Sequence, residues 1–94
     1  MERTVEVVPE AGLHARPASK FVQTAGEFDA EVTVGRADGD ASGLVNANSM
    51  LAVTGLNVKH GDSVRIVAEG PDASRALDAL AAILETAVDE TAGE

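Results

Sequence analysis

Three short segments of this chain alternate polar and apolar side chains, and this alternation limits the fold more than any other feature. The segments span residues 4–7, 31–34 and 63–68. Such a pattern is typical of strands that bury one face and leave the other in water. The segments are too short, and alternate too regularly, for a parallel sheet covered on both sides. We therefore expect a sheet with one solvated face.

Apolar residues take helical spacing in the segment that follows the first of these strands. Ala18, Phe21, Val22 and Ala25 fall on one side of a helical projection, which predicts an amphipathic helix over residues 15–26. Gly26 is well suited to end this helix as its C-cap. The helix is therefore expected to cover the buried face of the sheet.

Two further helices are predicted later in the chain. Residues 46–54 form a short helix whose N-cap is Asn46 or Asn48. Pro71 and Asp72 open the last helix. Its inward stripe consists of Ala76, Leu77, Leu80, Ile83, Leu84 and Ala87.

These predictions define the fold class. A Gly- and Asp-rich turn over residues 35–43 leads into a short strand at 44–45, so the element order is β-α-β-β-α-β-α. This order predicts an α+β open-faced β-sandwich, in which three helices cover one face of a four-stranded antiparallel sheet. Residues 1–88 are expected to form a single domain, and residues 89–94 a frayed tail.

Composition excludes several classes of function. The chain has 94 residues, no cysteine and a net charge of −9, with only two lysines, Lys20 and Lys59. Without cysteine, neither a disulfide nor a thiolate metal site can form, and we expect no metal and no cofactor. The acidic balance argues against nucleic acid as a partner, since phosphate contacts require clustered Lys and Arg. No apolar run is long enough for a membrane span, and the first residues do not resemble a signal peptide, so we expect a cytoplasmic protein.

The acidic excess also resembles that of proteins from a salt-loaded cytoplasm. Lysine is scarce and alanine abundant, while Asp and Glu number 16 against seven Lys and Arg. High ionic strength screens the repulsion among so many carboxylates. Composition favours this halophile-like interpretation over that of an ordinary acidic protein.

The stretch Gly12-Leu13-His14-Ala15-Arg16-Pro17-Ala18 carries the strongest functional signal. His14 is expected at the N-cap of the first helix, where free backbone N–H groups and the helix dipole favour an anion. The dipole disfavours a protonated ring, so it should lower the pKa of His14 and leave a nucleophilic nitrogen at neutral pH. Arg16 can supply a fork of donors to phosphoryl oxygens. Together these residues could accept and hold a phosphoryl group.

This motif resembles that of the HPr family, the histidine phosphocarriers of the phosphoenolpyruvate-dependent sugar phosphotransferase system. The resemblance continues in Phe21-Val22, in residues 48–51 and in residues 61–70, and it spans nearly the whole chain. It implies that His14 is phosphorylated through Nδ1 and that Arg16 assists. It also implies that the phosphoryl group comes from enzyme I and leaves to an enzyme IIA-type domain. A protein of this kind is a carrier without a substrate pocket of its own, and we expect a monomer.

Two other functions remain open at this point. A dedicated carrier would use the same chemistry but serve fructose uptake or a dihydroxyacetone kinase. A small α+β interaction module would not be phosphorylated at all, since one fold can host many functions. The motif around His14 makes this last interpretation the weakest of the three.

The family resemblance also singles out residues in the second helix. Ser49 lies where some members carry a regulatory serine for a dedicated kinase, but Asn48 replaces the usual lysine and Ala52 a frequent glycine. A purely structural role, in which Ser49 only caps or decorates the short helix, is therefore favoured. Met50 and Leu51 match positions that the family uses to dock partners, and we expect one of them in the core and the other exposed.

Two other features are read as structural. His60 lies beside Gly61 in a turn and is interpreted as a solvated loop residue. Residues 35–40 superficially resemble a calcium loop, but they lack the flanking helices and the terminal Glu. We therefore interpret this segment as a hairpin turn.

Overall fold

The computed structural model describes residues 1–8, 12–13, 15–39 and 43–85. Within these ranges the chain forms seven elements in the expected order β-α-β-β-α-β-α. They are β1 (Glu2–Glu6), α1 (Ala15–Ala25), β2 (Glu31–Arg36), β3 (Val45–Asn46), α2 (Met50–Gly55), β4 (Ser63–Glu69) and α3 (Ala73–Glu85). The predicted tail at residues 89–94, and Ala87 of the predicted helical stripe, lie outside the described residues.

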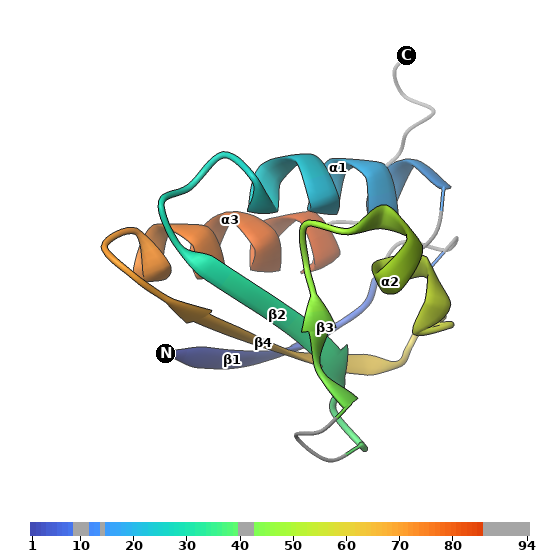
Figure 1. Ribbon diagram of the computed structural model, residues 1–94. Coiled ribbons are helices and arrows are strands. Elements are labelled where there is room, and N and C mark those ends of the chain that lie inside the picture. Colours follow the sequence, from blue (N-terminus) through green and yellow to red (C-terminus); the bar gives the residue numbers. More distant parts are fainter. Residues whose placement is uncertain (9–11, 14, 40–42, 86–94) are drawn as a thin grey trace.

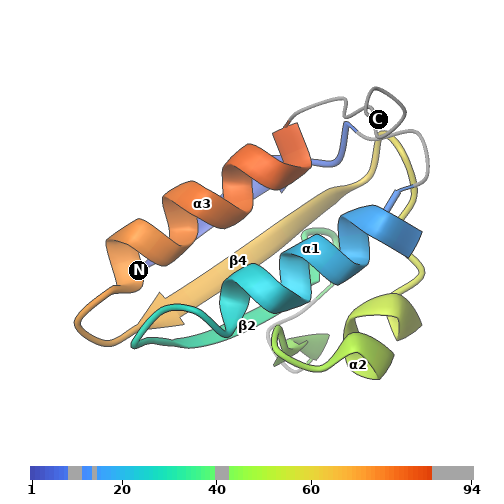
Figure 2. The ribbon, with the colours of Figure 1, turned by 90° about the horizontal axis from the view of Figure 1, so that it is seen from above.

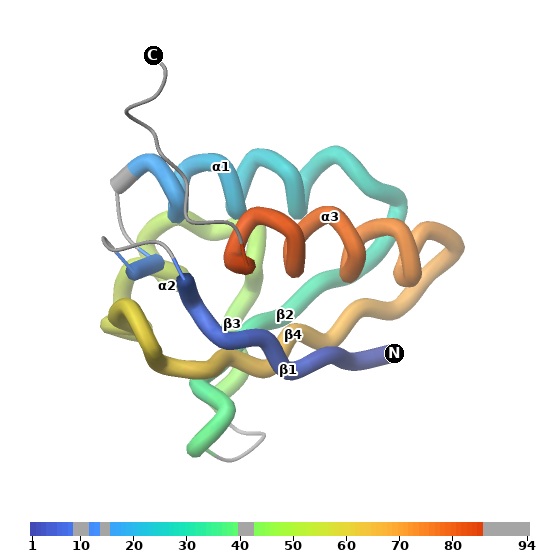
Figure 3. Tube along the Cα trace, turned by 180° about the vertical axis from the view of Figure 1, so that it is seen from behind, coloured from blue at the N-terminus to red at the C-terminus, as the bar shows by residue number. Residues whose placement is uncertain are grey.

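The four strands form one antiparallel sheet in the order β1-β4-β2-β3. The helices lie on one side of this sheet, as Figure 1 shows, and the opposite side is open. Seen from above in Figure 2, α1 and α3 run side by side over the sheet, and α2 lies beside α1. Strand β1 forms one edge, in front in Figure 3. The predicted open-faced sandwich is therefore confirmed.

The core lies between the sheet and the helices, and among the described residues it contains no buried polar or charged side chain. It is rich in valine and alanine, and Phe21 of α1 is its largest fully buried side chain. Val5, Val64 and Ile66 project from the buried face of the sheet. The predicted stripe of α3 is buried at Ala76, Leu77, Leu80 and Leu84, while Ile83 is only partly buried.

Several element boundaries differ from the predictions. Strand β1 begins and ends earlier than residues 4–7, although Val5 and Val7 are both buried as expected. Strand β2 continues through Gly35 and Arg36, which were predicted to turn, because both pair with β4. Strand β3 lies one residue later than the predicted 44–45. Strands β2 and β3 follow one another along the chain and pair antiparallel, as a hairpin requires, while residues 40–42 of the predicted turn lie outside the described residues.

One end of the molecule gathers acidic side chains, and we call it the acidic end (Asp29, Glu31, Glu69 and Asp72). Glu31 and Glu69 are direct cross-strand partners in β2 and β4, and both are exposed. The loops beside them are tied together, since Asp29 N–H donates to Asp72 Oδ2 at 2.9 Å and Asp72 N–H donates to the Asp29 carbonyl at 3.2 Å. Like charges directly opposite one another in a sheet destabilise it.

Candidate functional site

The candidate site lies where α1 begins. His14 is outside the described residues, but the helix starts at the next residue, Ala15. The first turn contains no acidic side chain, so no carboxylate of this turn competes with a bound anion for the positive end of the helix dipole. Pro17 is buried in this turn and has no N–H that would need a partner, while Arg16 is exposed. The first turn of α1 therefore presents backbone N–H groups and a guanidinium to the solvent side.

The residues before His14 are held firmly. Leu13 is fully buried, and its N–H donates to the Val58 carbonyl at 3.0 Å. Gly12 has φ +72, and a Cβ at this position would lie 2.5 Å from Val58 O and 2.7 Å from Lys59 Cα. Only glycine combines that conformation with so close an approach to another backbone. Gly12 and Leu13 are therefore packed on residues 58–59.

Helix α2 lies beside α1, and Ser49 caps it. The Ser49 Oγ accepts a hydrogen bond from Ala52 N–H at 3.3 Å. The prediction of Asn46 or Asn48 as N-cap is therefore wrong. Asn46 belongs to β3, and its side-chain oxygen accepts a hydrogen bond from Asn48 N–H at 2.8 Å. A helix capped by Asn46 would begin three residues earlier than α2 does.

The cap makes a stability prediction. Ser49→Ala should lower the free energy of unfolding by about 1 kcal/mol, because one N-terminal N–H of α2 loses its partner. Thermal or urea unfolding of the two proteins measures the difference. Ser49→Asp, which keeps an accepting oxygen at the cap, serves as the control and should retain most of the stability. Equal stability of Ser49→Ala and the wild type would contradict the capping role.

Met50 and Leu51 are both exposed, with fractional exposures of 40% and 85%. The prediction that one of them lies in the core is therefore wrong. Helix α2 has only six residues, and Val53 alone among them is buried. Only a narrow stripe of so short a helix is buried, and Met50 and Leu51 lie outside that stripe. The pair forms an exposed apolar patch next to α1.

Charge is unevenly distributed along the chain, a feature that the sequence analysis missed. Residues 11–26 and 41–61 contain no Asp or Glu, although the chain has 16. These two segments include α1 and α2, which pack against each other. They carry Arg16, Lys20 and Lys59. Helix α1 thus carries basic side chains, and neither α1 nor α2 carries a carboxylate, within an acidic protein; Asp62 lies just beyond the second segment, in the turn that Gly12 and Leu13 pack on.

The turn between α2 and β4 lies under the entry to α1. Asp62 organises this turn: its Oδ2 accepts from Lys59 N–H at 3.0 Å and from Arg36 Nη1 at 3.2 Å. The bond from the Lys59 backbone, followed by the charge of Arg36, holds the pKa of Asp62 below its usual value. Asp38 and Asp62 together raise the pKa of Arg36. His60 is exposed as predicted, but its Nδ1 also lies 2.7 Å from the Val8 carbonyl oxygen.

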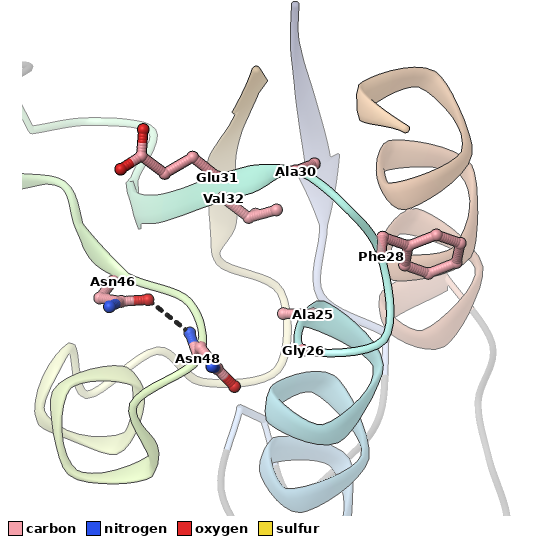
Figure 4. A pocket seen from close by; sticks show the side chains of 8 residues that line it. All are labelled: Ala25, Gly26, Phe28, Ala30, Glu31, Val32, Asn46 and Asn48. Carbon is pink, nitrogen blue, oxygen red and sulfur yellow. Dashed lines mark hydrogen bonds between the residues drawn. The ribbon is translucent and has the colours of Figure 1, made fainter. Parts of the chain in front are cut away.

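A shallow hollow near the end of α1 does not belong to this site. Figure 4 shows its lining, which includes Ala25, Gly26, Glu31, Asn46 and Asn48. Ala25 is the last residue of α1, so the hollow lies about 15 Å along the helix from the first turn, at a rise of about 1.5 Å per residue.

The described ranges of the chain contain no group of three or more His, Asp or Glu side chains placed to bind a metal ion. No helix among the described residues is long and apolar enough to cross a membrane.

Comparison with known proteins identifies the family. Residues 1–86 match the family model described as "PTS HPr component phosphorylation site". The chain belongs to the HPr family of phosphocarriers. Members of this family transfer phosphoryl groups within the phosphotransferase system, so the sequence-based assignment is confirmed.

Several known proteins are similar to this chain over most of its length. The phosphocarrier protein HPr of Haloferax volcanii is 71% identical over 86 residues, which cover 92% of this chain and 94% of that protein. A multiphosphoryl transfer protein of Vibrio cholerae is 39% identical over 87 residues, which cover 93% of this chain but 22% of that protein. The crystal structure of HPr from Bacillus anthracis superimposes with a TM-score of 0.82 at 39% identity, covering 89% of this chain and 95% of that one.

Proposed function

We propose that His14 is the phosphoryl acceptor of this HPr-family protein and that the bond forms at Nδ1. Its lone pair would bond to phosphorus as the bond between phosphorus and the donor protein breaks. The position of His14, one residue before α1, carries the proposal. The N-terminal N–H groups and the dipole of α1 would stabilise the added negative charge once it is on the ring. The match to a family described by its phosphorylation site supports this assignment.

Arg16 is proposed to bind the phosphoryl oxygens. It lies in the first turn of α1 and is exposed, so its guanidinium is accessible to a group at the end of the helix. A guanidinium offers two parallel donors to an oxyanion and keeps its charge at any physiological pH. Its role would be to hold the phosphoryl group between one partner and the next.

The exposed patch of Met50 and Leu51 is proposed to dock the donor and acceptor proteins. It lies on α2, next to α1, and Lys20 and Lys59 lie on the same carboxylate-free segments. An apolar centre with a charged rim is the usual composition of a transient interface. The basic rim would favour partners with an acidic surface around their own site.

The docking role can be tested at Leu51. Leu51→Ser should raise the KM of enzyme I for this carrier about tenfold, because a largely exposed leucine that anchors a partner contributes little to folding but much to binding. Steady-state phosphorylation rates at several carrier concentrations give KM. Val67→Ser, on the open side of the sheet, is the matched control and should leave KM unchanged. An unchanged KM for Leu51→Ser would remove this residue from the interface.

Enzyme I is the proposed donor and an enzyme IIA-type domain the proposed acceptor, both in the cytoplasm, with the carrier acting as a monomer. The larger multiphosphoryl transfer protein of Vibrio cholerae, to which this chain is similar, supports a place among phosphotransfer partners. The carrier would form a phosphohistidine intermediate without turning over a substrate by itself. A dedicated carrier for a dihydroxyacetone kinase would differ only in the acceptor, and transfer assays with each acceptor separate the two.

Ser49 phosphorylation by a serine kinase is a second proposal for the same surface. The residue is only partly buried and lies directly before Met50, so a phosphate there would add charge beside the docking patch. Its hydrogen bond to Ala52 N–H favours the capping role described above. Acid-stable phosphate at Ser49, isolated from cells, would establish the regulatory role.

The deciding experiment is an intact-mass measurement after incubation with phosphoenolpyruvate and enzyme I. The carrier should gain the mass of one phosphoryl group, and mild acid should remove it, because phosphohistidine is acid-labile and phosphoserine is not. An unchanged mass would favour an interaction module that is not phosphorylated.

A further inference from the structure

The chain has few side chains that a peroxide oxidises. It contains no cysteine, tryptophan or tyrosine, so the thioether sulfurs of its two methionines are its most easily oxidised groups. These residues are Met1 and Met50, and both are exposed, with fractional exposures of 65% and 40%. An effect of mild peroxide on this protein is therefore expected to arise at one of these two sulfurs.

The two methionines lie in distant parts of the molecule. Met1 extends β1 along β4: its ammonium donates to the Ala68 carbonyl at 3.0 Å, and its carbonyl accepts from Ala68 N–H at 2.8 Å. Met50 is the first residue of α2. The N-terminus and α2 lie toward opposite ends of the molecule (Figure 1 and Figure 3). Oxidation of Met1 is thus an internal control for oxidation of Met50.

Met50 belongs to the exposed apolar patch beside α1, where Leu51 is its neighbour. A methionine side chain has three rotatable bonds and a polarizable sulfur, so it adapts to surfaces of different shape. This adaptability suits a carrier that docks a donor and an acceptor on the same patch. The same side chain also exposes a sulfur atom to oxidants in solution.

The backbone beneath this side chain is fixed independently of the sulfur. Ser49 caps the helix, and Thr54 Oγ1 donates to the Met50 carbonyl at 2.9 Å. Val53 is the residue that anchors α2 in the core, and Met50 is not part of that core. A change at the sulfur should therefore alter the surface of α2 without unfolding it.

We propose that Met50 is an oxidation site through which hydrogen peroxide weakens the docking of this carrier to its partners. The proposal rests on the docking role proposed above for the patch. In the reaction, a lone pair of the sulfur bonds to one peroxide oxygen as the O–O bond breaks, which gives a sulfoxide and one molecule of water. Two thiols reverse the step: the sulfoxide oxygen leaves as water, and the thiols form a disulfide.

The sulfoxide turns an apolar side chain into a strongly polar one. In a docked complex its oxygen loses hydrogen bonds to water, and an apolar partner surface does not replace them. Binding therefore weakens, while the chemistry at His14 is not affected. The expected signature is a rise in KM at constant kcat.

The first test compares each protein before and after treatment with hydrogen peroxide, which catalase removes before enzyme I is added. Peptide mapping should show one added oxygen at Met1 and one at Met50. The KM of enzyme I for the oxidised wild type should rise about fivefold at constant kcat, and a methionine sulfoxide reductase with a dithiol should restore it.

Met50→Leu is the matched variant, since leucine is close to methionine in volume and has no sulfur. The same treatment then oxidises Met1 alone, and the KM of this variant after treatment should equal its own KM before treatment. Met50→Gln tests the effect without an oxidant: its polar amide should give a KM about fivefold above that of Met50→Leu.

An unchanged KM of wild-type protein that is fully oxidised at Met50 would overturn the proposal. Met50 that stays reduced while Met1 is oxidised would overturn it as well, as would an equal rise in KM for peroxide-treated Met50→Leu. Thermal melts should show the oxidised protein folded at the assay temperature, and unfolding there would replace the docking explanation. The carrier function fails separately, if the untreated wild type takes up no phosphoryl group.

Discussion

The His14→Ala variant should take up no phosphoryl group from phosphoenolpyruvate and enzyme I, while the wild type becomes fully phosphorylated. Alanine has no nucleophilic nitrogen, and the N-terminus of α1 alone can attract an anion but cannot form a covalent bond to phosphorus. The variant should remain folded, since the residues around this position keep their contacts: Leu13 is buried and bonded to Val58, and Pro17 and Ala18 are buried.

Intact mass, read at the end point of the reaction, is the measurement. His60→Ala is the matched control because it removes the other histidine of the chain, and it should still reach complete phosphorylation. A thermal melt of His14→Ala excludes unfolding as the cause of any loss. Complete and acid-labile phosphorylation of His14→Ala would show that another residue is the acceptor.

The second large effect concerns salt. The melting temperature should rise by about 10 °C between 0.1 M and 2 M KCl, equivalent to about 2 kcal/mol for a domain of this size. The net charge is −9, and the acidic end brings Glu31 and Glu69 directly opposite one another. Salt shortens the screening length from about 10 Å at 0.1 M to about 3 Å at 1 M and so removes repulsion between such neighbours.

The structure offers variants that separate this repulsion from general salt effects. Glu31→Gln/Glu69→Gln should melt higher than the wild type at 0.1 M KCl and gain less from added salt. Asp78→Asn is the contrasting control, because Asp78 forms an ion pair of 2.8 Å with Arg3, an attraction that salt weakens. This variant should gain at least as much from salt as the wild type does. A melting temperature that does not change up to 2 M KCl would reject the halophile-like interpretation.

The order and type of the elements could be predicted from the sequence because alternation and helical spacing are local patterns. Boundaries that depend on distant partners could not. Gly35 was read as the start of a turn, but it pairs with Arg65 in β4, and its missing Cβ leaves room for Leu44, whose Cδ2 would lie 3.0 Å away. A glycine that makes space inside a strand is indistinguishable, in sequence, from one that begins a turn.

In the candidate site, too, features set by local patterns could be predicted and features set by distant partners could not. The motif around His14 marks the start of α1 by local chemistry alone, and the helix indeed begins at Ala15. The cap of α2 was misassigned because Asn46, Asn48 and Ser49 are all good N-caps: the pairing of β3 excludes Asn46, and no local pattern separates Asn48 from Ser49. The contact between His60 and Val8 joins residues 52 positions apart, so no local pattern could reveal it.

The uneven distribution of charge gives the molecule an electrical polarity. In dilute salt, an approaching acidic protein would be turned toward α1 and α2 before any contact forms, since these two helices carry no carboxylate. At molar salt, attraction beyond about 3 Å is largely cancelled. Recognition would then depend on the fit of Leu51 and Met50 against the partner, and association would slow toward the rate of unguided collision. The protein would thus associate with its partners through long-range electrostatic attraction in dilute salt and through shape complementarity at molar salt.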